Sequence, residues 1–173
     1  NDIIALAFSD TGNLYATTGS GGNASTLLEI NPTNGSLIQN IGPIGYNSVT
    51  GLAFHPATGV LYGHAQGPHR LITINPLTGV GTSVGLSGVN SNVTDIGFDP
   101  VTEILYGIAR QSGEIVTFNL ATGASTVLGN TGSIGSACGI GSDGAILWLK
   151  CQSEIYTVNT TDGSTSFQAI IRE

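Results

Sequence analysis

Positive charge is scarce in this sequence. Only Arg70, Arg110, Lys150 and Arg172 are cationic, against eleven Asp and Glu residues, and the formal net charge is −7. Nucleic-acid affinity depends on Lys and Arg side chains that neutralise phosphates, so this balance argues against a polyanion as partner. We expect no nucleic-acid partner and no affinity for an anionic membrane surface.

Long apolar runs and helical periodicity are missing too. No apolar run approaches the roughly 18 to 20 residues of a membrane span, and no charged leader precedes an apolar signal core. We therefore expect a soluble, already processed chain without membrane insertion. Gly, Thr, Ser, Asn, Val and Ile are abundant, hydrophobic residues make up 40% and charged residues only 9%, a composition typical of a β protein.

An internal repeat organises the chain. The stretch "FHPATGVLYG" at 54–63 recurs as "FSDTGNLYA" from Phe8, "FDPVTEILYG" from Phe98 and "IGSDGAILWL" from Ile140, with these anchors 46, 44 and 42 residues apart. A second motif follows each copy: "LEINPTNG", "ITINPLTG", "VTFNLATG" and "YTVNTTDG". A catalytic apparatus is needed once, whereas turn chemistry is needed in every repeat, so both motifs are interpreted as turns.

The turn residues predict antiparallel strands. Pro pre-sets the backbone at the second turn position, Asn or Asp caps the turn with its side chain, and Gly supplies the positive φ at the exit. Alternating segments such as "TDIGF" and "EILYGIA" flank the turns. Each unit therefore holds four short strands, named a to d here, and the chain is predicted to be one all-β domain with Phe8, Phe54, Phe98 and Ile140 buried at equivalent places.

Four-stranded units of this length are typical of β-propeller blades. The run "TLLEINPTNGSLIQNIGPIGYNSVTGLAFHPATGVLYGH" resembles the secreted and cell-surface propellers built from Tyr-Val-Thr-Asn repeats. The resemblance implies a β-propeller with four blades of four antiparallel strands in this chain, at approximately 1–45, 46–90, 91–133 and 134–173. It also implies an extracellular or cell-surface location and ligands at the channel mouth on the side of the b–c and d–a connections.

Candidate binding residues are sought on that irregular side. Tyr46 is an unrepeated aromatic in a predicted d–a loop, and His64 and His69 fall in a predicted b–c loop. Arg70, Arg110 and Lys150 map to the same side. His64 and His69 could reach one metal, but zinc takes three or four ligands, so no metal site and no cofactor are predicted. Tyr15, Tyr62, Tyr106 and Trp148 occupy one repeated strand position, which favours packing.

Two cysteines and four sequons complete the candidate features. Counting from a turn centred on Asp143 and Gly144 places Cys151 diagonal to Cys138 on one sheet face, and a small bulge would allow a disulfide. A reducing compartment with two free thiols is the alternative. The sequons at Asn23, Asn34, Asn92 and Asn159 are possible N-glycosylation sites, although chance alone predicts two or three.

Ring closure is left open by the repeats, because the chain starts on strand a and ends on strand d. The four blades could form a complete small propeller, half of an eight-bladed ring, or a segment that associates head to tail. We expect a non-enzymatic, self-associating structural or adhesive module that uses the exposed edges of the first and last blades. The alternatives are a module that binds carbohydrates or small ligands, and a secreted lyase or hydrolase.

Overall fold

The computed structural model describes residues 2–19, 23–88, 92–110, 112–132 and 138–171, and in these ranges it consists of sixteen strands without a helix. Blade 1 comprises β1 (Ile3–Phe8), β2 (Leu14–Thr18), β3 (Ala24–Ile30) and β4 (Leu37–Asn47), and blade 2 comprises β5 (Val49–Phe54), β6 (Leu61–Ala65), β7 (Arg70–Ile74) and β8 (Gly81–Leu86). Blade 3 comprises β9 (Val93–Phe98), β10 (Leu105–Ala109), β11 (Glu114–Phe118) and β12 (Ser125–Asn130), and blade 4 comprises β13 (Cys138–Ser142), β14 (Leu147–Cys151), β15 (Glu154–Val158) and β16 (Thr165–Ile170). No helix in these ranges is long and apolar enough to cross a bilayer.

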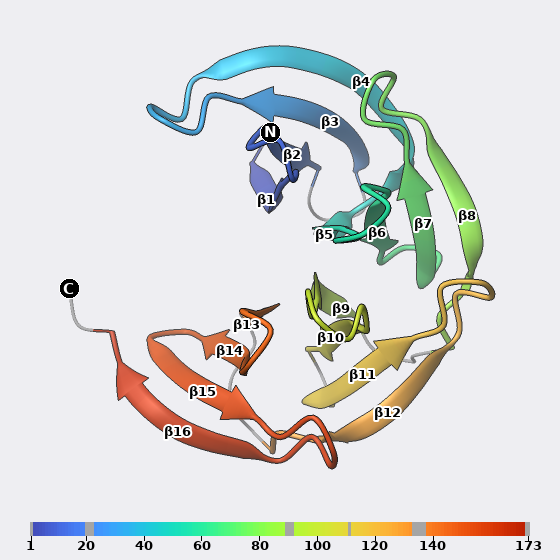
Figure 1. The fold of residues 1–173 in the computed structure, drawn as a ribbon. Helices are drawn as coiled ribbons and strands as arrows, with labels where there is room; N and C mark the ends of the chain where they lie inside the picture. Colours follow the sequence, from blue (N-terminus) through green and yellow to red (C-terminus); the bar gives the residue numbers. More distant parts are fainter. Residues whose placement is uncertain (1, 20–22, 89–91, 111, 133–137, 172–173) are drawn as a thin grey trace.

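The blades follow one another around a common axis. In each blade the four antiparallel strands are hydrogen-bonded in chain order, which confirms the predicted all-β architecture. Strands β1, β5, β9 and β13 line the axis, and β4, β8, β12 and β16 form the rim (Figure 1). The arc is open between blade 1 and blade 4, so those two blades each have one flank without a neighbouring blade (Figure 1).

The c–d turns are built as their sequence predicts. The Asn that opens each turn accepts a backbone N–H two residues on with its side chain, as in Asn75 to Leu77 at 2.9 Å. Its carbonyl also accepts the N–H of the turn glycine at 2.8 Å in all four blades. These glycines, Gly35, Gly79, Gly123 and Gly163, have φ between 70° and 80°, the left-handed region that glycine enters without strain.

The prediction that Ile140 is the blade 4 equivalent of Phe8, Phe54 and Phe98 is wrong by two residues. Phe8, Phe54 and Phe98 lie opposite Leu14, Leu61 and Leu105, and the residue in this place in blade 4 is Ser142, opposite Leu147. Ile140 instead corresponds to Leu6, Leu52 and Ile96. The a–b turn of blade 4 is shorter than those of blades 2 and 3. Aligning the apolar residue Ile140 with Phe8, Phe54 and Phe98 in the sequence therefore gave the wrong register.

The core lies between blades rather than inside any one of them. The Phe that ends strand a packs on a Tyr of the preceding blade: the ring centroids of Tyr15 and Phe54 are 5.4 Å apart, and those of Tyr62 and Phe98 are 5.6 Å apart. Phe98 is 9% exposed and Phe54 is partly buried, but Phe8 is 60% exposed. The prediction that all four anchors are buried is therefore wrong for Phe8, because no blade among the described residues packs on that flank of blade 1.

Paired glycines bring the rims of neighbouring blades together. A Cβ at Gly85 of β8 would lie 1.8 Å from the Thr122 carbonyl oxygen in the next blade, and a Cβ at Gly129 of β12 would lie 1.9 Å from that of Asp162. Gly42 of β4 meets Thr78 and Gly79 in the same way. Each outer strand has a β-bulge beside this position, which turns the strand toward the next blade.

The predicted disulfide joins Cys138 to Cys151. The two cysteines lie directly opposite each other on β13 and β14, with their Cα atoms 4.1 Å apart. The expected diagonal register was wrong by one residue on each strand, because the turn is centred between Gly144 and Ala145. Such a bridge is typical of proteins outside the reducing cytosol.

Replacing Gly129 with Ala should weaken the contact between blades 3 and 4. The new Cβ would overlap the backbone of Asp162, and neither backbone can move freely, so we expect a loss of roughly 1 to 3 kcal/mol in the free energy of unfolding. Gly141→Ala is the matched control, since a Cβ there meets nothing within 4 Å, and it should change stability by less than about 0.5 kcal/mol. Urea denaturation measures both, and equal effects would contradict the contact.

Candidate functional site

The four inner strands line the axis of the arc, and Asp95 is the one acidic residue within them. Ala5, Gly51, Asp95 and Gly139 occupy the same register position on β1, β5, β9 and β13. Three of these residues are small, and Asp95 is the exception. A carboxyl group therefore stands at one point of an otherwise apolar inner layer.

Asp95 bridges blades 3 and 4 through hydrogen bonds. Its Oδ2 accepts the backbone N–H of Ile140 in blade 4 at 3.0 Å, and its Oδ1 accepts the N–H of Ile96 at 2.9 Å. At the same position between blades 2 and 3, a Cβ on Gly51 would lie 2.7 Å from the Ile96 nitrogen. The gap between β9 and β13 at this position is therefore wide enough for the carboxyl group of Asp95, whereas the gap between β5 and β9 has room only for a glycine.

Asp95 lines two cavities. One, of about 280 Å³, opens toward the a–b turns and is lined by residues of all four blades, including Phe8, Phe54 and Ser142. The other, of about 380 Å³, opens toward the d–a connections and includes Ile3, Thr50, Thr94 and Cys138. Asp95 is common to both linings, so a molecule entering from either side reaches the same carboxyl group.

Burial changes the acidity of Asp95. The cost of desolvating the ionised form raises the pKa of this carboxyl group from 3.8 to about 7, although the N–H groups of Ile140 and Ile96 oppose the rise. Near neutral pH the group is present in both protonation states. It can donate a proton in a hydrogen bond when neutral, or hold positive charge when ionised.

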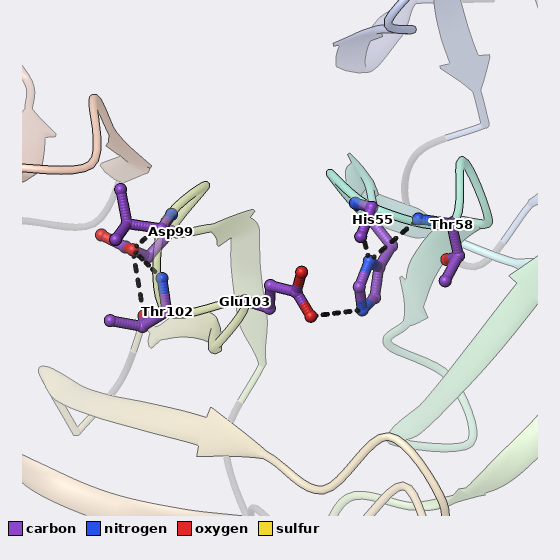
Figure 2. Close-up of polar contacts among 7 residues, drawn as sticks. His55, Thr58, Asp99, Thr102 and Glu103 are labelled. Atoms are coloured by element: carbon purple, nitrogen blue, oxygen red, sulfur yellow. Dashed lines mark hydrogen bonds and ion pairs between the residues drawn. The ribbon is translucent and has the colours of Figure 1, made fainter.

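The polar groups on the a–b turn side bind one another (Figure 2). His55 Nε2 lies 3.9 Å from Glu103 Oε2 in the next blade, and its Nδ1 accepts the Ala57 and Thr58 N–H groups. Asp99 accepts the Ser142 hydroxyl at 2.6 Å and the Thr102 N–H at 2.7 Å. The Ser142 bond, followed by that of Thr102, lowers the pKa of Asp99 to about 2. These groups stabilise turns and join blades.

His64 and His69 are close together but do not lie in one loop. His64 lies inside β6 and is wholly buried, whereas His69 is in the following turn and partly buried. Ser87 Oγ lies 3.3 Å from His64 Nε2 and donates to the His69 carbonyl oxygen. Burial, followed by the charge of His69, lowers the pKa of His64 to about 3.

Both Nδ1 atoms, of His64 and His69, are buried without a hydrogen-bond partner. Two imidazoles fall short of the three or four ligands that zinc takes. Among the residues with described positions, no three His, Cys, Asp or Glu side chains gather around a metal position. The loop placement predicted for His64 was wrong because its apolar neighbours continue the strand through it.

The other predicted contact residues lie on separate elements. Tyr46 belongs to β4 rather than to a loop and packs against the core of blades 1 and 2. Arg70 begins β7 and donates to Ser83 Oγ, and Arg110 is exposed after β10. Lys150 is exposed within β14, at the register position at which Thr17 of blade 1 bonds to the next blade. The three cations belong to three blades, and whether any of these residues binds a ligand stays a prediction.

The sequon residues Asn23, Asn34 and Asn159 are exposed, whereas Asn92 is partly buried. Two of them already use their side chains in turns, since Asn34 accepts the Ser36 N–H and Asn159 accepts the Thr161 N–H. Glycosylation at these positions stays a prediction.

Asp95 was missed by sequence reasoning. A signal existed in the repeat, because "TDIGF" is the one strand-a segment that contains a charged residue. The signal can be recognised only when the four copies are aligned in the correct register. In that register Ala5, Gly51 and Gly139 occupy the position of Asp95. The separation of the anchors alone did not provide this register.

Comparison with family models places the chain in a repeat family. The model described as "Repeat of unknown function (DUF6923)" matches residues 5–172, and the chain belongs to this family. A sequence comparison with curated proteins found no match.

Solved structures share the fold at low sequence identity. A protein of unknown function from Bacteroides thetaiotaomicron superposes with a TM-score of 0.72 and 16% identity over 95% of this chain and 42% of that one. An auxiliary nutrient binding protein from Bacteroides ovatus gives 0.68 and 13% over 97% and 47%. A catalytically inactive virginiamycin B lyase from Staphylococcus aureus with quinupristin gives 0.63 and 16% over 99% and 56%. The chain therefore spans about half the length of these structures.

Asp95 and His64 give the folding free energy opposed pH dependences. Asp95 has a raised pKa in the fold, so its stabilising contribution is complete below about pH 4 and is lost as the pH rises to about 7. His64 has a lowered pKa, so its contribution is complete above about pH 6.5 and is lost as the pH falls toward 3. Between these limits each contributes a slope of about 1.4 kcal/mol per pH unit, with opposite sign.

Asp95→Asn should therefore expose the His64 dependence. We expect the unfolding free energy of this variant to fall by about 1.4 kcal/mol per unit as the pH is lowered from about 6.5 to about 4.5, while the unsubstituted chain changes little. His64→Gln should gain stability over the same interval. Urea denaturation across this range measures all three proteins, and parallel curves would contradict the raised pKa of Asp95.

Proposed function

Because the chain belongs to a propeller-repeat family and forms an open arc, we propose that it is a non-enzymatic, extracellular structural module that works by association. Its open flanks bind further blades of the same architecture. An adhesive role follows from the same property, because an open flank that binds a blade of another molecule links the two molecules. The disulfide between Cys138 and Cys151 supports a location outside the reducing cytosol.

The main support for this proposal is that a row of apolar side chains on β1 is exposed. Ile3, Leu6 and Phe8 of β1 are 49%, 54% and 60% exposed. The equivalent residues of β5 are Val49 and Leu52, at 0% and 3%, together with the partly buried Phe54, and those of β9 are Val93, Ile96 and Phe98, at 0%, 2% and 9%. The same positions are thus covered wherever a preceding blade is present.

Covering this row would contribute substantial free energy. Removal of a large apolar side chain from water is worth about 1.5 to 3 kcal/mol, and exposed contiguous apolar surface in soluble proteins commonly marks a place of association. The backbone of β1 already has the conformation of its buried equivalents. Little ordering would therefore oppose binding of a blade there.

The non-enzymatic part of the proposal rests on the dispersal of acid and base groups. On the irregular side His64 is buried, Glu114 accepts the Ser112 hydroxyl, and Glu154 accepts the Tyr156 hydroxyl. General acid–base catalysis needs such groups within reach of one reacting atom. These three residues lie in blades 2, 3 and 4 and do not form such a set.

Ligand binding in the channel is a second candidate function, favoured by Asp95. A carboxyl group between two cavities can orient a small polar ligand through its hydroxyl groups, as in carbohydrates, or attract a small cation. A glycan array and calorimetry with amines would test this function. Binding that disappears in Asp95→Asn, whose shape is the same, would favour it over association as the main activity.

Self-association is the first measurement. We expect the mass from light scattering to rise above the 17.6 kDa of one chain as the concentration increases through the micromolar range. High salt should leave the association intact or strengthen it, because apolar burial drives it. A constant mass of 17.6 kDa across the series would contradict the proposed function and bring ligand binding to first place.

A further inference from the structure

Resting on the proposed function, we propose that the open flank of blade 1 binds the open flank of blade 4 in a second copy of this chain. The contact is head to tail: β1 of one copy takes the place on blade 4 that β5 takes on blade 1 and β9 takes on blade 2. The two flanks carry opposite halves of the interface that already joins blades inside the chain. A second copy therefore extends an existing contact instead of forming a new kind.

Blade 4 presents the aromatic half of the repeated ring pair. Tyr15, Tyr62, Tyr106 and Trp148 occupy one register position on the b strands, each opposite a small residue of strand a. Tyr15 and Tyr62 meet the Phe of the next blade with centroids 5.4 and 5.6 Å apart. No blade in the described residues covers Trp148 or Phe8 in this way. The head-to-tail contact pairs Phe8 of one copy with Trp148 of the other.

At two further positions on the blade 4 flank, the side chain is more exposed than the equivalent side chains of blades 1 to 3. Leu27, Leu71 and Ile115 on the c strands are wholly buried, whereas the equivalent Ile155 is only partly buried. Ile44, Ser87 and Thr131 on the outer strands are at most 8% exposed, and the equivalent Ile171 is 48% exposed. Together with Trp148, these residues form an apolar strip that matches the row on β1.

The contact between blades 1 and 2 includes a side-chain hydrogen bond for which the two open flanks also have a donor and an acceptor. Thr17 Oγ1 donates to the Val49 carbonyl oxygen of the next blade at 2.7 Å. Lys150 occupies the position of Thr17, and Ile3 occupies that of Val49. An incoming β1 thus brings the Ile3 carbonyl oxygen, and beside it the exposed carboxylate of Asp2, toward Lys150. A long flexible cation can satisfy both groups.

The rim makes this contact weaker than the internal ones. Gly42, Gly85 and Gly129 allow the rims of adjacent blades to touch, but the equivalent residue on β16 is Ala169. Its methyl group faces the place where Gly35 of the incoming blade would lie, and a Cβ at Gly35 meets nothing within 4 Å in one copy. Gln168 also replaces the partly buried Ile41, Val84 and Leu128 of the other bulges. We therefore expect a reversible association.

Pairing between outer edges is the competing mode. β16 has hydrogen bonds to a neighbouring strand on one side only, and its Phe167 and Ile170 are 54% and 50% exposed. However, β4, β8 and β12 also lie at sheet edges, so an open edge does not distinguish blade 4 from the others. Edge pairing of two β16 strands would relate identical surfaces, whereas the flank contact relates two different ones.

That difference gives a decisive experiment. Phe8→Asp disables the blade 1 flank and Trp148→Asp disables the blade 4 flank, so each variant alone should stay monomeric in light scattering. Each keeps one intact flank, and an equimolar mixture should therefore form a dimer that contains one copy of each variant. Loss of the Phe8 contact should raise the dissociation constant roughly tenfold or more.

Three further variants keep the result interpretable. Lys150→Glu serves if Trp148→Asp fails to fold, because Lys150 is exposed on the same flank. Leu77→Asp, at a side chain 83% exposed in a c–d turn, is the matched control and should associate normally. Ala169→Gly removes the methyl group at the rim and should tighten association roughly two- to tenfold.

The outcomes separate the two proposals. A chain that stays monomeric at every concentration contradicts the proposed function itself. Association that survives Phe8→Asp and Trp148→Asp, or a mixture that does not restore the dimer, overturns only the head-to-tail contact. Loss of association in a Phe167→Asp variant alone would assign the contact to the β16 edge.

Discussion

The contact between neighbouring blades is the interaction on which the rest of this structure depends. A four-stranded antiparallel sheet has two faces and cannot cover either by itself, so each blade needs the one before and the one after. The row that ends in Phe54 or Phe98 is covered by the preceding blade, and the Tyr row is covered by the following one. Glycine pairs such as Gly85 with Gly123 then close the rim.

In the described residues the repeated interface leaves one flank of blade 1 and one flank of blade 4 uncovered, and those flanks are where association is proposed. Leu6 and Phe8 show this directly, because their counterparts in the other blades are covered. The blade 4 flank is less uniform, since Lys150, Gln168 and Ala169 replace residues that the other blades bury or keep small. If the proposed outward contact forms, these differences should make it weaker than the internal ones.

Asp95 represents a different use of the same architecture. The inner strands of the other blades carry Ala5, Gly51 and Gly139 at this register position, and Asp95 replaces the small residue with a carboxyl group that accepts the Ile140 N–H. Burial removes solvating water from the ionised carboxylate of Asp95, which raises the pKa of the group to about 7. It also places a titratable group at the junction of two cavities. One side chain thus joins two blades and lines two cavities.

Much of the fold follows from the sequence, because turns are local. Asn75 and Gly79 specify their turn through contacts within five residues, and four copies of that turn imply four sheets. The Cys138–Cys151 bridge was predictable for the same reason, although its register was not. The short a–b turn of blade 4 shifted the register, and with it the equivalence of Ile140. Strand limits near Tyr46 and His64 also failed, since neither residue has a local signal that ends a strand.

Which residues are exposed was decided by the tertiary structure alone. Phe8 and Phe54 lie in nearly the same local sequence, yet one is exposed and the other packs on Tyr15. Asp95 and His64 owe their shifted pKa values to groups on other strands and other blades. The sequence by itself determined a repeated sheet with two turns in each unit. Only the packing of one blade on the next determined where that repetition leaves an apolar flank uncovered, because burial depends on neighbours that the local sequence does not contain.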